Sequence, residues 1–199
     1  NYGQQIELAP NISATFYNAG HILGSATILL DIFGTRVLFT GDLGRKPAIM
    51  VPDREVPKDV DVLITESVYG NRLHGSLEES LNVLLNAVRH AEKTKGVLLI
   101  PSFSLERTQI ILSLLDRAIS ENRCPAVPIF MDSPLAAKVT DVYRENSSFL
   151  REDIRNRLTS GDDPFSFPSL QVTIHDTESQ VIEHTKSPKV IIAGAGMSH

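Results

Sequence analysis

The stretch Phe39-Thr-Gly-Asp-Leu-Gly-Arg45 sets how the first part of this chain is interpreted. An apolar run over residues 35–39 leads into it, and Gly41 permits the sharp turn that places Asp42 just past the end of a strand. A carboxylate in that position is a common way to present a metal ligand or an acid/base group. Taken alone, the stretch favours the plainer interpretation, an Asp in a glycine-rich turn that accepts hydrogen bonds from nearby backbone.

Short strands are expected on both sides of Asp42. Apolar and polar residues alternate, or apolar residues run together, so that strands are predicted at 4–8, 12–17, 27–33, 36–40 and 61–65. His21 lies on a loop of this predicted meander, and Glu66 directly follows its last strand. Residues 45–58 contain three prolines and predict a surface loop.

From residue 71 the pattern changes to alternating helices and strands. Ser76 and Glu79 form a capping box that opens a helix running towards Lys93. Further helices are predicted near 105–119, 132–143 and 178–183, and strands at 96–100, 127–131, 170–174 and 189–193. This alternation predicts a parallel sheet covered on both faces. Residues 147–168 are mixed and charged, and mobility is expected at 160–164. We therefore expect an α/β chain with two domains, 1–70 and 71–199.

Composition and charge exclude several classes of protein. The 199 residues are 42% hydrophobic, enough for a substantial core, and a net charge of −5 excludes a broadly basic surface. The single Cys124 excludes an internal disulfide and a cysteine metal cluster, which fits a cytoplasmic location. No apolar run is long enough for a membrane span, so no membrane partner is expected. Because the chain starts without Met and stops after an apolar strand, we expect an excised piece of a longer protein.

His21, Asp42 and Glu66 are residue types that bind zinc or manganese. Each lies at or beside the end of a predicted strand, close to a glycine. A carboxylate can bridge two metal ions, and a pair of ions activates water and stabilises the oxygens of a phosphoryl displacement. Three ligands cannot fill two coordination spheres, and the chain has no His-x-His pair. Spacing alone therefore supports only a partial metal site.

A second group of candidates lies where predicted strands pass into helices. Ser102, Ser104 and Arg107 place hydroxyls, backbone N–H groups and a guanidinium at a helix start, where phosphate is favoured. The alternative is that Ser104 simply caps the helix. Ser133 begins the next predicted helix and has the same two interpretations. The stretch Gly194-Ala-Gly-Met-Ser198 could cradle a nucleotide phosphate or form a plain glycine turn.

Several of these stretches resemble one known family. Ala19-Gly-His-Ile-Leu-Gly-Ser-Ala26 and Phe39-Thr-Gly-Asp-Leu-Gly44 resemble the third and fourth metal-ligand motifs of the metallo-β-lactamase fold. Thr65-Glu-Ser-Val-Tyr-Gly70 resembles the first motif of its β-CASP branch, the nucleases that process RNA and DNA. Three later stretches are similar to the β-CASP insert: Ile100-Pro-Ser-Phe-Ser-Leu-Glu-Arg-Thr-Gln109, Phe130-Met-Asp-Ser-Pro-Leu-Ala-Ala-Lys-Val-Thr140 and Val190-Ile-Ile-Ala-Gly-Ala-Gly-Met-Ser198.

The resemblance implies the C-terminal part of a metallo-β-lactamase αββα domain, followed by a β-CASP insert with a doubly wound parallel sheet. It implies that His21 ligates one of two zinc ions, that Asp42 bridges both, and that Glu66 orients a histidine which protonates the leaving group. That histidine and a His-x-His-x-Asp-His motif would lie outside these residues, so the piece itself is expected to be inactive. Substrate contacts are expected from Ser67, Tyr69, Ser102, Ser104, Arg107, Ser133 and Ser198.

The function implied is hydrolysis of RNA phosphodiester bonds by a zinc-dependent ribonuclease, with single-stranded RNA as the partner. A DNA repair-type nuclease of the same branch is the first alternative. The second is a non-catalytic nucleotide-binding or scaffolding module, against which the presence of His21, Asp42 and Glu66 argues. The sequence leaves a homodimer open.

Overall fold

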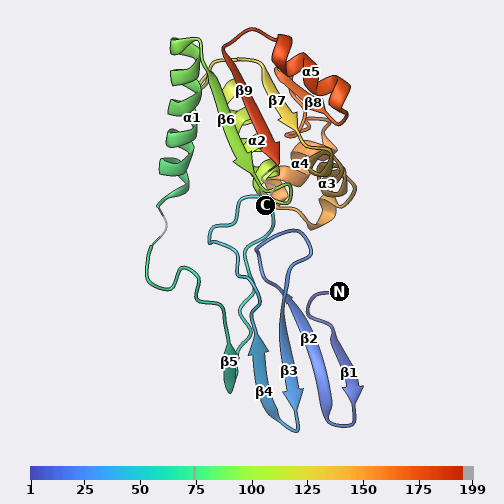
Figure 1. Cartoon of the computed structure of the whole chain (residues 1–199). Coiled ribbons are helices and arrows are strands. Elements are labelled where there is room, and N and C mark those ends of the chain that lie inside the picture. The colour runs from blue at the N-terminus through green and yellow to red at the C-terminus, as the bar shows by residue number, and fades with distance from the viewer. Residues whose placement is uncertain (74, 195–199) are drawn as a thin grey trace. The chain divides into compact units, whose positions relative to one another are not determined.

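The computed structural model describes residues 1–73 and 75–194, which form two compact units (Figure 1). The first unit comprises residues 1–73 and 148–152, and the second comprises the other described residues. The mixed α/β fold with a parallel sheet is confirmed. None of the helices in these described ranges is long and apolar enough to cross a membrane.

The first unit is built on a five-stranded sheet whose strand order follows the chain (Figure 1). Its strands are β1 (Gln5–Ala9), β2 (Ile12–Asn18), β3 (Ala26–Ile32), β4 (Thr35–Phe39) and β5 (Val62–Ile64). Neighbours are antiparallel except β4 and β5, which run parallel. Phe33 and Gly34 join β3 to β4 with φ values of 51° and 86°, the positive values that a tight two-residue hairpin turn needs.

One face of this sheet contributes buried side chains. Leu29 of β3 and Leu38 of β4 are paired in register, and both are buried because alternate residues of a strand point to the same face. Past the strands, Thr40 donates its backbone N–H to Ile64 O at 3.0 Å, and the hydroxyls of Thr40 and Thr65 lie 3.2 Å apart. The segments that follow β4 and β5 therefore leave the sheet side by side.

The loop at 45–58 is partly buried, in contrast to the surface loop that its composition predicts. Met50 and Ala48 are buried. Arg151 donates its backbone N–H to Met50 O at 2.9 Å and Nη1 to Ala48 O at 2.5 Å. Asn18 Nδ2 donates to Pro52 O at 3.0 Å. Backbone carbonyls that a loop normally leaves to water thus accept hydrogen bonds from two side chains and one backbone N–H, which anchors the loop.

The second unit is built on a four-stranded parallel sheet in the order β6-β9-β7-β8 (Figure 1). Its strands are β6 (Val97–Ser102), β7 (Ile129–Asp132), β8 (Leu170–Thr173) and β9 (Lys189–Gly194). The last strand along the chain is therefore internal, and Val190 and Ile192 on it are buried. All four strands point the same way, so their carboxyl ends form one edge, at Ser102, Gly194, Asp132 and Thr173.

Helices connect these strands: α1 (Leu77–Thr94), α2 (Arg107–Ser120), α3 (Pro134–Glu145), α4 (Glu152–Thr159) and α5 (Asp176–His184). The predicted capping box of α1 is confirmed, because Ser76 Oγ accepts from the Glu79 N–H at 3.1 Å and Glu79 Oε2 accepts from the Ser76 N–H at 2.7 Å. Helical cover on both faces was predicted for the whole sheet, but Leu99 on the edge strand β6 is 60% exposed. One face of β6 is therefore open in the described part of the chain.

Residues 147–168 are more regular than their mixed, charged sequence predicts. They contain a 3-10 helix (Ser147–Phe149) and α4, and Phe165 is buried. Arg157 on α4 contacts Asp116 on α2, and its Nε donates to Asp162 Oδ2 at 2.6 Å. Ion pairs between segments distant in sequence organise this region, which local periodicity cannot indicate.

Candidate metal and phosphate sites

His21 and Asp42 come together at the strand ends of the first unit. His21 lies on the loop between β2 and β3, and Asp42 follows β4. His21 Nε2 is 3.9 Å from Asp42 Oδ2, and the two side chains are 42% and 75% exposed. Two ligands of one tetrahedral zinc ion stand roughly 3.3–3.6 Å apart, because each is about 2.0–2.2 Å from the metal. The pair therefore fits two ligands of a single ion after small side-chain rotations.

A close approach of two glycines brings these loops together. The Gly44 N–H donates to Ala19 O at 3.0 Å. A Cβ added to Gly44 would lie 1.6 Å from Gly20 O, and a Cβ added to Gly20 would lie 2.7 Å from the backbone nitrogen of Arg54. Only glycine fits at either position. The two loops therefore touch backbone to backbone, which fixes His21 relative to Asp42.

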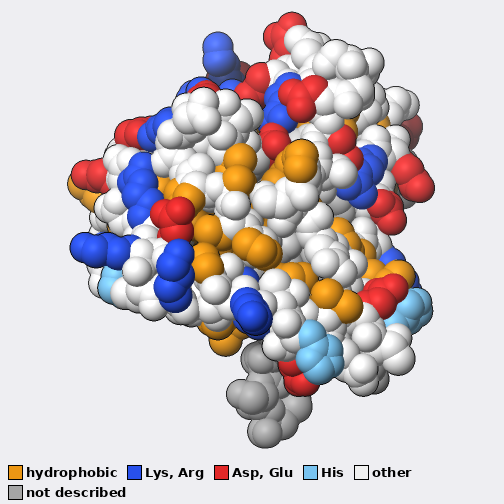
Figure 2. Space-filling view, turned by 90° about the horizontal axis from the view of Figure 1, so that it is seen from above, with side chains coloured by type: hydrophobic (Ala, Val, Ile, Leu, Met, Phe, Trp, Pro, Cys, Tyr) orange, Lys and Arg blue, Asp and Glu red, His pale blue; other side chains and the backbone are white. Residues whose placement is uncertain are grey.

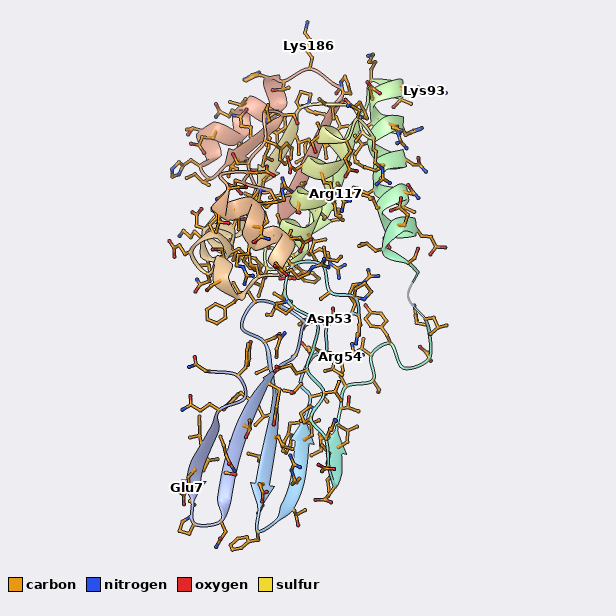
Figure 3. The ribbon with its side chains drawn as sticks, turned by 180° about the vertical axis from the view of Figure 1, so that it is seen from behind. Glu7, Asp53, Arg54, Lys93, Arg117 and Lys186 are labelled. Atoms are coloured by element: carbon orange, nitrogen blue, oxygen red, sulfur yellow. The ribbon has the colours of Figure 1, made fainter. Side chains whose placement is uncertain are left out.

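The anchored loop at 45–58 supports this contact from the other side. Arg54 and Asp53 lie on it, as Figure 3 shows. Arg54 Nη1 donates to Gly44 O at 2.5 Å. Asn18 Oδ1 accepts the Gly20 N–H at 2.9 Å, so both glycines are held by side chains as well as by each other. The amino-acid sequence carries no local signal for these supporting residues beyond the glycines in the two quoted motifs.

Glu66 contacts the loop that carries Asp42. Its Oε1 accepts the backbone N–H of Leu43 at 2.6 Å. The carboxylate therefore lies directly beside the Asp42 loop. Its predicted role of orienting a histidine concerns a residue outside this chain and stays a prediction.

The residues present fit part of a zinc site. Among the described residues, no group of three or more His, Cys, Asp and Glu side chains is close enough to hold a metal ion. His21 and Asp42 supply one nitrogen and one carboxylate, the donor set that zinc accepts, yet two ligands do not close a tetrahedron. Further ligands must come from elsewhere if an ion binds here.

Ser67 and Tyr69 follow Glu66 in consecutive turns. Ser67 O accepts the Gly70 N–H at 3.0 Å, and Tyr69 O accepts the Arg72 N–H at 3.2 Å. The Tyr69 side chain is exposed, which is compatible with contact to a ligand. Their predicted substrate contacts stay predictions.

Ser104, Ser133 and Gly194 converge at the carboxyl edge of the parallel sheet. The Oγ atoms of Ser104 and Ser133 are 3.3 Å apart. A Cβ added to Gly194 would lie 3.3 Å from Ser133 Oγ and 3.9 Å from Ser104 Oγ, so the glycine at the end of β9 leaves room for both hydroxyls. Ser102, at the end of β6, is buried, and its Oγ accepts the Thr108 hydroxyl at 3.2 Å. Ser102 therefore supports the loop and does not face outward.

The alternative interpretation of Ser104 as a helix cap is wrong. The residue at the N-cap of α2 is Glu106, which makes no side-chain cap hydrogen bond. Ser104 instead meets Ser133, which does cap its own helix, α3, by accepting the Ala136 N–H at 3.2 Å. Arg107 is the first residue of α2 and is exposed. Ser198 lies outside the described residues.

Asp132 is a structural neighbour of this group, although its sequence pattern predicts only a helix start. Its Oδ1 accepts the hydroxyls of Thr173 at 2.7 Å and Ser179 at 2.8 Å. The carboxylate therefore joins β7 to β8 and α5 at the same edge. Asp132 is the last residue of β7 and directly precedes Ser133, the N-cap of α3. Its hydrogen bonds therefore hold the end of the strand from which α3 begins.

Comparison with known proteins places these features in one family. Residues 108–199 match the family described as the Beta-Casp domain. The chain is 32% identical over 196 residues to Ribonuclease TTHA0252 of Thermus thermophilus, and this alignment covers 98% of the chain and 45% of the relative. It is 31% identical to the RNase J-like protein of Methanocaldococcus jannaschii, and this alignment covers 99% of the chain and 46% of the relative. It is 35% identical to Cleavage and polyadenylation specificity factor 73 of Drosophila melanogaster, and this alignment covers 91% of the chain and 26% of the relative.

The chain spans less than half the length of these curated relatives. The alignments nonetheless run along nearly all of it, through the strand-end loops of His21 and Asp42 and through the parallel sheet. From the matched domain, the relatives and the fold, this chain belongs to the β-CASP branch of the metallo-β-lactamase superfamily.

Proposed function

We propose that the protein containing this chain is a zinc-dependent ribonuclease that hydrolyses phosphodiester bonds in single-stranded RNA. The observation that carries the proposal is the His21–Asp42 pair, 3.9 Å apart and fixed by the contact between Gly20 and Gly44. The names of the relatives support it, because those from Thermus thermophilus and Methanocaldococcus jannaschii are called a ribonuclease and an RNase J-like protein.

His21 and Asp42 are the residues of this chain that would hold zinc. When bound, zinc supplies a water of lowered pKa and neutralises charge on the phosphoryl oxygens. The solvent exposure of both side chains leaves the site open to a substrate as large as RNA. Glu66 holds the Asp42 loop through the Leu43 N–H and, as we propose, completes the acid/base machinery with a histidine supplied by the rest of the protein.

The second unit offers groups that bind phosphate. The hydroxyls of Ser104 and Ser133 lie beside the N-termini of α2 and α3, whose dipoles favour negative charge. Arg107 is exposed at the first position of α2 and can donate two hydrogen bonds to one phosphate. We propose that these groups bind the RNA backbone.

The test compares two substrates with the protein at its natural length. A 5′-labelled single-stranded RNA and a single-stranded DNA of the same base sequence are incubated with the protein and zinc, and with a chelator. We expect cleavage of RNA that the chelator abolishes and that zinc restores. Preferential cleavage of DNA would instead support a DNA-directed nuclease of the same branch. No cleavage of either, with nucleotide binding retained, would support a non-catalytic module.

A further inference from the structure

Glu106 adopts a backbone conformation that L-amino acids rarely occupy. Its φ and ψ are 62° and −51°, and the Arg107 N–H donates to Leu105 O at 2.7 Å across it. A three-residue turn of this kind with positive φ at its centre is a strained γ-turn. Glycine would relieve the strain, yet a glutamate occupies the position. Strain of this kind persists only where the surrounding structure enforces it.

A buried contact with α3 holds this turn. Glu106 is only 8% exposed, and Tyr143 on α3 donates its hydroxyl to Glu106 Oε2. Tyr143 is fully buried and packs edge-to-face against Phe165, with ring centroids 6.5 Å apart. The Tyr143 hydroxyl therefore ties the Glu106 side chain, and with it the turn, to α3.

The same segment meets α3 at two further points. Gln109 Nε2 donates to Thr140 Oγ1 at 2.9 Å and to Ser104 O at 3.1 Å. Ser104 Oγ meets Ser133 Oγ at 3.3 Å. Residues 104–109 therefore contact α3 through Ser133 at its N-cap, Thr140 and Tyr143. The spacing of these three residues places them along one side of the helix.

The γ-turn determines where α2 begins. A helix started by Ser104 as its cap would direct the serine hydroxyl to the N–H groups of its own helix. The turn at Glu106 delays the helix to Arg107, and the Ser104 hydroxyl meets Ser133 instead.

We propose that Glu106 is a positioning residue for RNA, which holds the Ser104 hydroxyl and the start of α2 in the arrangement that binds the RNA backbone. The Glu106–Tyr143 hydrogen bond maintains that arrangement against the strain of the γ-turn. This inference rests on the proposed function, because it concerns how the same site contacts its substrate.

The test measures RNA affinity and folding stability on the same variants of the protein at its natural length. Glu106→Ala, Tyr143→Phe and the double variant are titrated against a short fluorescently labelled single-stranded RNA, and their Tm values are recorded. We expect each single variant to bind RNA about three- to tenfold more weakly, the effect of one lost orienting hydrogen bond. The double variant should bind RNA about as weakly as the singles, since each single variant already removes the Glu106–Tyr143 hydrogen bond. Glu106→Gln keeps an acceptor and should retain most of the affinity.

Asp116→Asn is the matched control. Asp116 is also buried in the second unit and bonded to a side chain of another helix, Arg157, but it lies in the C-terminal half of α2. The Asp116→Asn variant should lower Tm without weakening RNA binding. The inference is overturned if Tyr143→Phe, which removes one oxygen, lowers Tm as the control does and leaves RNA affinity unchanged. Failure of the unsubstituted protein to bind RNA would overturn the proposed function together with this inference.

Discussion

At the scale of single residues, Gly44 has the closest obstacle to an added Cβ among the glycines that the structure describes. Its missing side chain lets the Asp42 loop touch Gly20, and a Cβ there would lie 1.6 Å from Gly20 O. The obstacle is backbone, which cannot move aside as a flexible side chain can. We expect Gly44→Ala to separate the two loops and lower the free energy of unfolding by about 3 kcal/mol.

Chemical denaturation and zinc content measured on the natural-length protein check this prediction. Gly34→Asn is the control, because Gly34 has a positive φ but no atom within 4 Å of an added Cβ. Gly44→Ala should lose zinc and stability, whereas Gly34→Asn should retain both. A Gly44→Ala variant with unchanged zinc content would show that the glycine contact does not position the ligands.

Residue types alone could locate Asp42 but not Glu106. Asp42 follows an apolar strand within a recognisable motif, and the structure places it beside His21. Glu106 looks like an ordinary residue in the first turn of a helix capped by Ser104, because Ser is the stronger capping residue. In the structure α2 begins only after Glu106, whose side chain contacts Tyr143, a residue 37 positions away. Interactions at that separation leave no local signal.

At the scale of secondary-structure elements, Arg157 links α4 to its surroundings. Its Nε donates to Asp162 at 2.6 Å, which lowers the pKa of the Asp162 carboxyl below its ordinary value of about 3.9. A carboxyl with a lowered pKa in the folded state stabilises the fold above that ordinary value and ceases to do so as the pH falls through the folded pKa. Burial raises the pKa of Asp116, and its bond to Arg157 opposes that rise.

We therefore expect Arg157→Ala to raise the pKa of both Asp162 and Asp116. The fall in the free energy of unfolding that Asp162 causes at acid pH should then become smaller, since its carboxyl would titrate alike in the folded and unfolded states. Carboxyl-carbon NMR titration of the two aspartates measures this directly. Arg155→Ala on the same helix is the control and should leave both titrations near their original values. An unshifted Asp162 in Arg157→Ala would contradict the prediction.

Elements with strong local signals were predictable, and elements that depend on distant partners were not. The capping box of Ser76 and Glu79 marks the start of α1 in four residues of sequence, and the structure confirms it. Met50 lies in a proline-rich loop whose composition predicts exposure, but the distant Arg151 anchors that loop and Met50 is buried. The ion pairs that Arg157 of α4 forms with Asp116 and Asp162 likewise cannot be predicted from the hydrophobic periodicity.

At the scale of the whole molecule, the first sheet has an exposed apolar edge. β5 is its last strand, and Val62, Leu63 and Ile64 are all exposed, Leu63 by 58%. Edge strands with apolar side chains and unpaired backbone groups promote association. We expect the isolated 199-residue chain to self-associate, and Leu63→Lys to reduce this association in sedimentation velocity. Val83→Lys, which adds the same charge on the exposed side of α1, should not.

The distribution of charge bears on the proposed binding of RNA. In the face shown in Figure 2, Lys and Arg side chains are interspersed with Asp and Glu, and the chain carries a net charge of −5. The proposed binding of RNA would therefore rely on a few local contacts. We expect RNA affinity to fall with salt with a slope of about −1 to −3 on a log–log scale, as for a small number of neutralised phosphates. A slope near −6 would indicate a broad basic surface instead.

The central claim is that His21 and Asp42 belong to the zinc site at which RNA is hydrolysed. Zinc content and RNA cleavage are measured on the same preparations of the natural-length protein, of Asp42→Ala and of Glu7→Ala, the last on β1 (Figure 3). We predict about two zinc ions per chain in the unsubstituted protein and in Glu7→Ala, as a dinuclear phosphodiesterase site requires. Asp42→Ala should lose bound zinc and RNA cleavage together while it stays folded, with a Tm lowered by no more than the loss of the bound zinc explains. Undiminished zinc and undiminished cleavage in Asp42→Ala would contradict the account.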